Sequence, residues 1–149
     1  MRAASVCLAV ALGASSATAG PPSPLEVSGA WSPATGGTGA DVPLYLTIAN
    51  RGEADDLLRV RCPDAAHFSE KRATDLGEGT PAAREVKAIP VPAGGSVTLA
   101  PGGYHVMLLQ TTRRLGQGET FSCSLVFRNG GHHDVAVTVA ASDAAPAPR

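Results

Sequence analysis

The chain has 149 residues, of which 12 are Lys or Arg and 13 are Asp or Glu, so its formal net charge is −1. A near-neutral chain with only 4% aromatic residues lacks the basic surface and the stacking side chains that nucleic-acid-binding proteins use. The length suits one domain, and we expect no nucleic-acid partner.

The first residues are organised like a secretory signal peptide. Arg2 supplies the positive charge, Val6–Leu12 forms a short apolar core, and Ala17–Ala19 is a small-residue cleavage site. We therefore predict a signal peptide at residues 1–19 and a periplasmic location. No membrane span is expected, because the apolar run is too short to cross a bilayer. Cys7 precedes the cleavage site and lies within the apolar core, which argues against a lipid anchor.

The rest of the chain has the pattern of short strands separated by turns. A proline-rich linker at residues 20–25 leads into a β domain at residues 26–140, and residues 141–149 form a tail that we expect to be disordered. No segment has a helical period, so the predicted fold class is all-β, an antiparallel β-sandwich or partly open barrel of eight to nine short strands. The expected strands are Leu25–Trp31, Leu44–Ile48, Leu57–Arg61, Ala65–Lys71, Arg84–Ile89, Ser96–Leu99, the segment after Pro101–Gly103, Glu119–Phe127 and the segment around Val135–Val139, with an exposed loop at Asp75–Ala83.

Two cysteines, Cys62 and Cys123, remain after the predicted cleavage. An even number of cysteines in an exported protein favours a disulfide. The bridge would close a loop of roughly 60 residues and stabilise the fold by about 4 kcal/mol in the chain-entropy model. The alternatives are two separate buried thiols or a thiolate metal site.

A histidine and a methionine stand two residues apart in Tyr104–Leu109. In a strand, His105 and Met107 point to the same face, about 7 Å apart along the chain. An imidazole with a thioether is a ligand pair that favours Cu(I). The alternative is that Met107 fills the core and His105 is a hydrogen-bonded, half-buried side chain.

The other polar residues offer weaker candidates. The sequence contains no catalytic motif, and the acidic pair Asp55–Asp56 follows a turn, so we expect it to cap that turn or to face solvent. His132 and His133 follow a Gly-Gly turn, and His67 is isolated in the sequence, so we expect none of the three to be a metal ligand by itself.

Four segments of the chain form a combination with a characteristic order and spacing. They are Ala30–Thr35, Tyr45–Gly52 with Asp55–Leu57, Ile89–Gly95 and Pro101–Leu108. Together they resemble the periplasmic copper chaperones of the PCu(A)C type, the DUF461 family. The resemblance covers roughly residues 26–140 and implies a cupredoxin-like β-barrel.

The resemblance also implies a copper site that is only half present in this sequence. The family binds Cu(I) through a His, a Met about eleven residues later, and a His-x-Met pair. The pair matches His105 and Met107, whereas the first two positions fall at Arg72 and Ala83. Arg72 is a permanent cation without a lone pair, and Ala83 has no donor atom.

We therefore expect an exported protein that binds and delivers copper, with Cu(I) as its metal and an incomplete site. Its partner would be a copper-accepting periplasmic or membrane-anchored protein. The alternative is a divergent family member that binds no metal and acts as a periplasmic binding or assembly module. Nothing in the sequence supports an enzyme.

Overall fold

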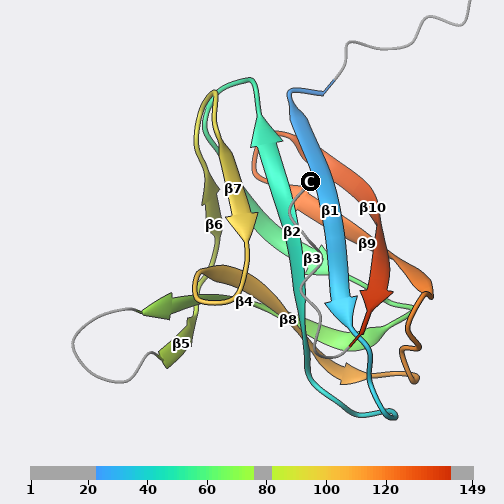
Figure 1. Ribbon diagram of the computed structural model, residues 1–149. Coiled ribbons are helices and arrows are strands. Elements are labelled where there is room, and N and C mark those ends of the chain that lie inside the picture. The colour runs from blue at the N-terminus through green and yellow to red at the C-terminus, as the bar shows by residue number, and fades with distance from the viewer. Residues whose placement is uncertain (1–22, 76–81, 142–149) are drawn as a thin grey trace, which may run out of the picture.

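The computed structural model describes residues 23–75 and 82–141 and builds them into ten strands (Figure 1). Within these ranges there is no helix, and hence no helix long and apolar enough to cross a membrane. The predicted signal peptide, the start of the linker and nearly all of the predicted tail lie outside the described residues. The strands are β1 (Leu25–Pro33), β2 (Val42–Asn50), β3 (Asp55–Arg61), β4 (Ala66–Asp75), β5 (Ala82–Glu85), β6 (Ile89–Val91), β7 (Ser96–Leu99), β8 (Tyr104–Thr111), β9 (Thr120–Phe127) and β10 (Gly131–Ala140).

The strands join in one curled sheet with the order β5-β4-β8-β2-β1-β10-β9-β3-β6, and β7 pairs with β2 beside this path. In Figure 1, β1 and β2 cross in front of β3 and β9, so the sheet bends round until its two halves face each other. The predicted all-β, barrel-like class is confirmed. One pairing differs from the antiparallel prediction: β1 and β10 run parallel, with Trp31 opposite Thr138. A parallel pair needs a long connection, and here the whole domain lies between the first and last strands.

Alternating side chains form the core between the two halves of the sheet. Leu44, Leu46 and Ile48 are at most 2% exposed, and the residues between them are only half-buried, as the sequence pattern predicts. On β9 the alternate residues from Phe121 to Phe127 are also buried, and one of them is Cys123. Cys123 forms the predicted disulfide with Cys62, which directly follows β3.

The segment between residues 75 and 91 departs from the prediction at both ends. Most of the expected loop at Asp75–Ala83 lies outside the described residues, and its two ends are in strands, because β4 continues to Asp75 and β5 starts at Ala82. The expected strand Arg84–Ile89 is split, because β5 pairs with β4 whereas β6 pairs with β3. One straight strand cannot reach both edges of the sheet, so the chain breaks at residues 86–88.

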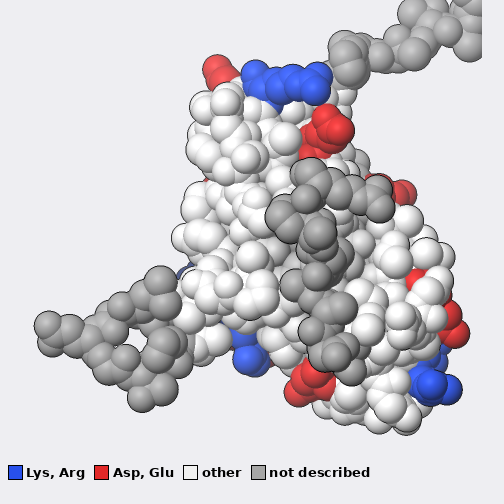
Figure 2. Space-filling model, in the orientation of Figure 1, with Lys and Arg blue, Asp and Glu red and all other residues white. Residues whose placement is uncertain are grey.

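The outer surface over β1, β2 and β7 carries few charged side chains, and most of those lie near its rim (Figure 2). This agrees with the small net charge of the chain.

Candidate metal centre

His105 lies near the start of β8, and its ring is oriented by the turn that precedes the strand. Its Nδ1 donates a hydrogen bond to the carbonyl oxygen of Gly103 at 3.1 Å. A carbonyl oxygen only accepts, so Nδ1 must carry the proton. In the neutral ring, Nε2 then has a free lone pair, which is the arrangement found in histidine ligands of metals.

The free nitrogen of His105 keeps contact with solvent although the residue is only 9% exposed. No fully buried side-chain nitrogen or oxygen lacks a hydrogen-bond partner in the described part of the chain. The Nδ1 bond is the one hydrogen bond that the structure gives His105. Because Nε2 has no hydrogen-bond partner, it cannot be fully buried and must be partly exposed at the surface. Nε2 is therefore not sealed within the core.

Met107 shares the outer face of β8 with His105, as strand parity predicts. The residues between and beyond them, Val106 and Leu108, are fully buried and point into the core. Met107 is half-buried, with Pro43 of β2 opposite it on one side and Glu70 of β4 on the other. The thioether is therefore held on a β surface rather than within the core.

A row of side chains crosses four strands at the level of His105. Trp31 of β1 is opposite Tyr45 of β2, and their ring centroids are 4.9 Å apart. The β2–β8 register pairs residue 44 with residue 106, so Tyr45 is next to His105 on the outer face. Burial raises the pKa of Tyr45, which therefore stays a neutral phenol at physiological pH. The aromatic rings form an uncharged wall on one side of His105.

The other side of His105 is charged. Arg72 of β4 is the direct cross-strand partner of His105, and directly opposed side chains have Cβ atoms about 5 Å apart. Its guanidinium donates to the Oε2 of Glu70 from both Nη2, at 2.8 Å, and Nε, at 3.2 Å. Glu70 is in turn opposite Met107. The His-Met pair thus faces an Arg-Glu ion pair that is one-third exposed.

Ala83 falls on the same outer face. It is opposite Thr74, two residues after Arg72, and its side chain is exposed. Strand parity therefore places on one face of the sheet all four positions at which the resemblance places ligands, although the donor atoms are present only at His105 and Met107.

The remaining histidines do not complete this site. His132 and His133 are on β10, which is separated from β8 by β1 and β2. Nε2 of His133 is 3.1 Å from the carbonyl oxygen of Gly130, and its ring packs edge-on against Phe127. His67 is exposed at the other end of β4. The cysteines are joined to each other, and no group of three or more His, Cys, Asp or Glu in the described ranges could hold a metal ion.

The acidic pair has a structural role, but Asp55 binds a different turn from the one that it follows in the sequence. Both carboxylate oxygens of Asp55 accept backbone hydrogen bonds, from Asp56 and Asn129 to Oδ1 and from Gly130 to Oδ2. Asp56 forms an ion pair with Arg128 at 2.9 Å. Asp55 therefore caps the turn between β9 and β10 and is unavailable as a ligand.

Two features of the centre were missed at the level of sequence. Glu70 was not recognised as the partner of Arg72, although opposite charges two residues apart on a strand were the available signal. The role of the Gly103 carbonyl depends on the backbone conformation of the turn, which the residue types do not specify.

The fold defines the class of protein, because solved structures of PCuAC domains share it. The copper-bound PCuAC domain from PmoF2 has 25% identity and a TM-score of 0.67 over 79% of this chain and 93% of its own. The apo PmoF2 PCuAC domain has 26% identity and a TM-score of 0.68 over 83% of this chain and 95% of its own. The solution structure of CuI-DR1885 from Deinococcus radiodurans has 28% identity and a TM-score of 0.63 over 85% of this chain and 83% of its own. The protein has the PCuAC fold.

Sequence comparison gives the family. Residues 25–139 match the family model described as "Putative lipoprotein LpqE-like". The chain is also 32% identical over 116 residues to "Putative lipoprotein Lxx21020" of Leifsonia xyli subsp. xyli, covering 77% of this chain and 69% of that protein. The chain belongs to the LpqE-like family.

Proposed function

We propose that this protein is a copper-binding and copper-delivery protein that captures Cu(I) through Nε2 of His105 and Sδ of Met107. The observation that carries the proposal is the hydrogen bond from Nδ1 of His105 to the Gly103 carbonyl, because it leaves Nε2 as an accessible neutral donor beside a thioether. The copper-bound state of PCuAC relatives supports the same cargo. Imidazole and thioether are ligands that suit Cu(I).

The proposed mechanism is capture followed by ligand exchange. Two neutral donors leave the coordination of Cu(I) incomplete, so an acceptor with more or softer ligands can bind the ion before His105 and Met107 release it. Arg72 lowers the affinity further. A guanidinium on the neighbouring strand repels a monovalent cation, and Glu70 offsets part of this repulsion. Weak binding suits transfer better than storage.

Export to the periplasm is part of the proposal. The signal-peptide pattern of residues 1–19 supports it, and the family and the Leifsonia relative both carry the description of a lipoprotein. The acceptor would be a periplasmic or membrane-anchored copper protein. The neighbouring folds are copper-binding domains, and we propose no catalytic activity for this chain.

One observation favours a second candidate. The ion pair between Arg72 and Glu70 occupies the strand opposite the His-Met pair and satisfies the charges there without a metal. A family member with this arrangement would act as a metal-free binding or assembly module of the periplasm.

A competition titration distinguishes the two candidates. The mature protein is titrated with Cu(I) in the presence of a chromophoric chelator, beside the double variant His105→Ala, Met107→Ala. We expect the natural protein to remove copper from the chelator and the double variant to lose at least tenfold in affinity, which is about 1.4 kcal/mol. Equal binding by the two proteins would favour the metal-free module.

A further inference from the structure

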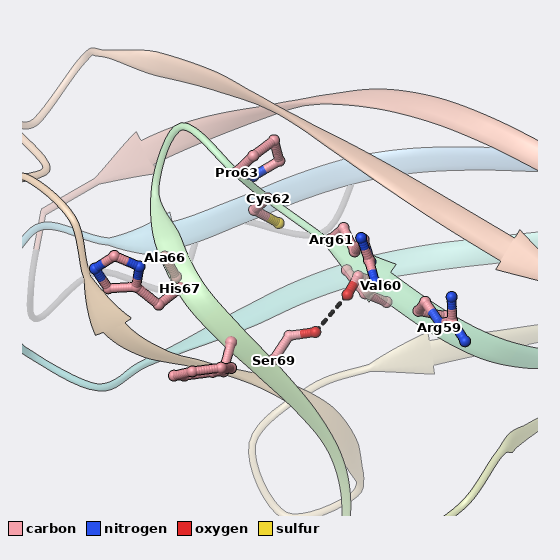
Figure 3. Close-up of a pocket in the computed structure, with 9 residues that line it drawn as sticks. Arg59, Val60, Arg61, Cys62, Pro63, Ala66, His67 and Ser69 are labelled. Carbon is pink, nitrogen blue, oxygen red and sulfur yellow. Dashed lines mark hydrogen bonds between the residues drawn. The ribbon is translucent and has the colours of Figure 1, made fainter.

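A hollow of about 420 Å³ opens between β3 and β4, where the two strands diverge after their connecting turn. Figure 3 shows Arg59 and Arg61 on β3, and His67 and Ser69 on β4. The hydroxyl of Ser69 donates to the carbonyl oxygen of Val60 and joins the two walls. The copper proposal makes no use of this surface.

The hollow is positively charged in a chain whose net charge is −1. Arg59 and Arg61 are two residues apart on β3 and exposed, and neither guanidinium takes part in an ion pair or hydrogen bond within residues 23–75 and 82–141. No acidic residue lines the hollow.

An apolar side chain borders the same hollow. Phe68 is 61% exposed and is the one large exposed hydrophobic residue in the described part of the chain. Its cross-strand partner is Leu109, and the next pair on that face is Glu70 with Met107. Phe68 is therefore a diagonal neighbour of Met107, at a distance of about 7–8 Å between such positions in a sheet.

We propose that this hollow binds an acidic segment of a partner protein, with carboxylates on Arg59 and Arg61 and an apolar side chain against Phe68. Arginine forks match carboxylates, and unpaired exposed guanidinium groups beside an aromatic ring are typical of protein interfaces. The concave shape fits a protruding chain segment better than the flat surface of a membrane. The hollow adjoins the face that carries Met107, so the partner would be the copper acceptor; this identification rests on the proposed function. The binding of an acidic segment is independent of the proposed function.

The probe is a fluorescein-labelled peptide of eight residues that repeats glutamate, aspartate and leucine. Its binding to the full mature protein is measured by fluorescence anisotropy. We expect saturable binding that weakens about tenfold in the double variant Arg59→Gln, Arg61→Gln and about fivefold in Phe68→Ser. The matched control is Arg51→Gln, Arg114→Gln, which removes the same charge from exposed positions outside the hollow and should leave affinity within twofold.

Three results would overturn the proposal: no saturable binding, equal weakening by both double variants, or equal binding of a peptide in which glutamine and asparagine replace the acids. Binding to phosphatidylglycerol vesicles that requires Phe68, without peptide binding, would assign the surface to a membrane and also overturn it. The same titration with the His105→Ala, Met107→Ala variant separates the two proposals, because peptide binding should persist there even if copper binding proves absent.

Discussion

The turn held by Asp55 and the face that carries His105 use buried polar side chains in opposite ways. Both carboxylate oxygens of Asp55 are bound by backbone N–H groups, and the nearby Cys62–Cys123 bridge joins β3 to β9 covalently. His105 is almost as buried, yet only one of its ring nitrogens is bonded. A polar group whose bonds are all satisfied holds the fold together, whereas one that keeps a free donor atom at the surface is available to a ligand.

This contrast predicts that the two regions can be altered separately. Changes at the β3–β9 connection should lower the free energy of unfolding and leave copper affinity unchanged in the molecules that remain folded. Changes on the outer face that carries His105 and Met107 should alter copper affinity and leave the free energy of unfolding unchanged. The four predictions below test that separation.

The largest effect is expected from removal of the disulfide. Replacement of Cys62 and Cys123 by Ala opens a loop with a sequence separation of 61 residues and should lower the free energy of unfolding by about 4 kcal/mol. Urea denaturation of the two proteins measures the loss, and wild-type protein under strong reduction should show a similar one. A loss below about 1 kcal/mol would mean that the bridge does little to constrain the unfolded chain.

The next effect is expected at Asp55. Asp55→Ala leaves the N–H groups of Asp56, Asn129 and Gly130 without their acceptor and should cost about 2–3 kcal/mol by thermal or urea unfolding. Asp56→Ala is the matched control, because it breaks only a partly exposed ion pair with Arg128 and should cost less than about 1 kcal/mol. Similar losses in both variants would contradict the distinction between the two acids.

A gain of copper affinity is expected when donors are added to the outer face that carries His105 and Met107. The double variant Arg72→His, Ala83→Met removes a cation and adds two donors at positions that share the outer face with His105 and Met107. Cu(I) affinity should rise at least tenfold, or about 1.4 kcal/mol, in the chelator competition. The control Arg51→His places a histidine on an exposed turn and should change nothing. An unchanged affinity in the double variant would show that this face does not form the site.

The smallest effect is the dependence of stability on pH. Burial alone raises the pKa of Asp55, but hydrogen bonds from the backbone of Asn129, Asp56 and Gly130 outweigh it and hold the pKa below its usual value of 3.8. A lowered pKa stabilises the fold above the pKa of the unfolded chain, and this contribution disappears as the pH falls through the folded pKa.

Asp55→Asn lacks this titration, so the stability gap between wild type and variant should be constant above about pH 5 and shrink below about pH 4. Urea denaturation at a series of pH values measures the gap. A gap that does not change with pH would place the origin of the stabilisation elsewhere.

Sequence alone determined the features that depend on local pattern and residue chemistry. The alternation of Leu44, Leu46 and Ile48 determined the buried face of β2, and the even cysteine count in a predicted exported chain pointed to the bridge that the structure contains. Strand parity put His105 and Met107 on one face, and the residue types at 72 and 83 already showed that two donors are absent.

Tertiary structure decided everything that depends on which strands become neighbours. Register placed Arg72 opposite His105 and Glu70 opposite Met107, so an ion pair faces the predicted ligands. The curl of the sheet opened the hollow between β3 and β4, and the Gly103 turn selected the free nitrogen of His105. Pairing between distant strands is a property of the whole sheet, because each register depends on all the others, and no local run of residues encodes it.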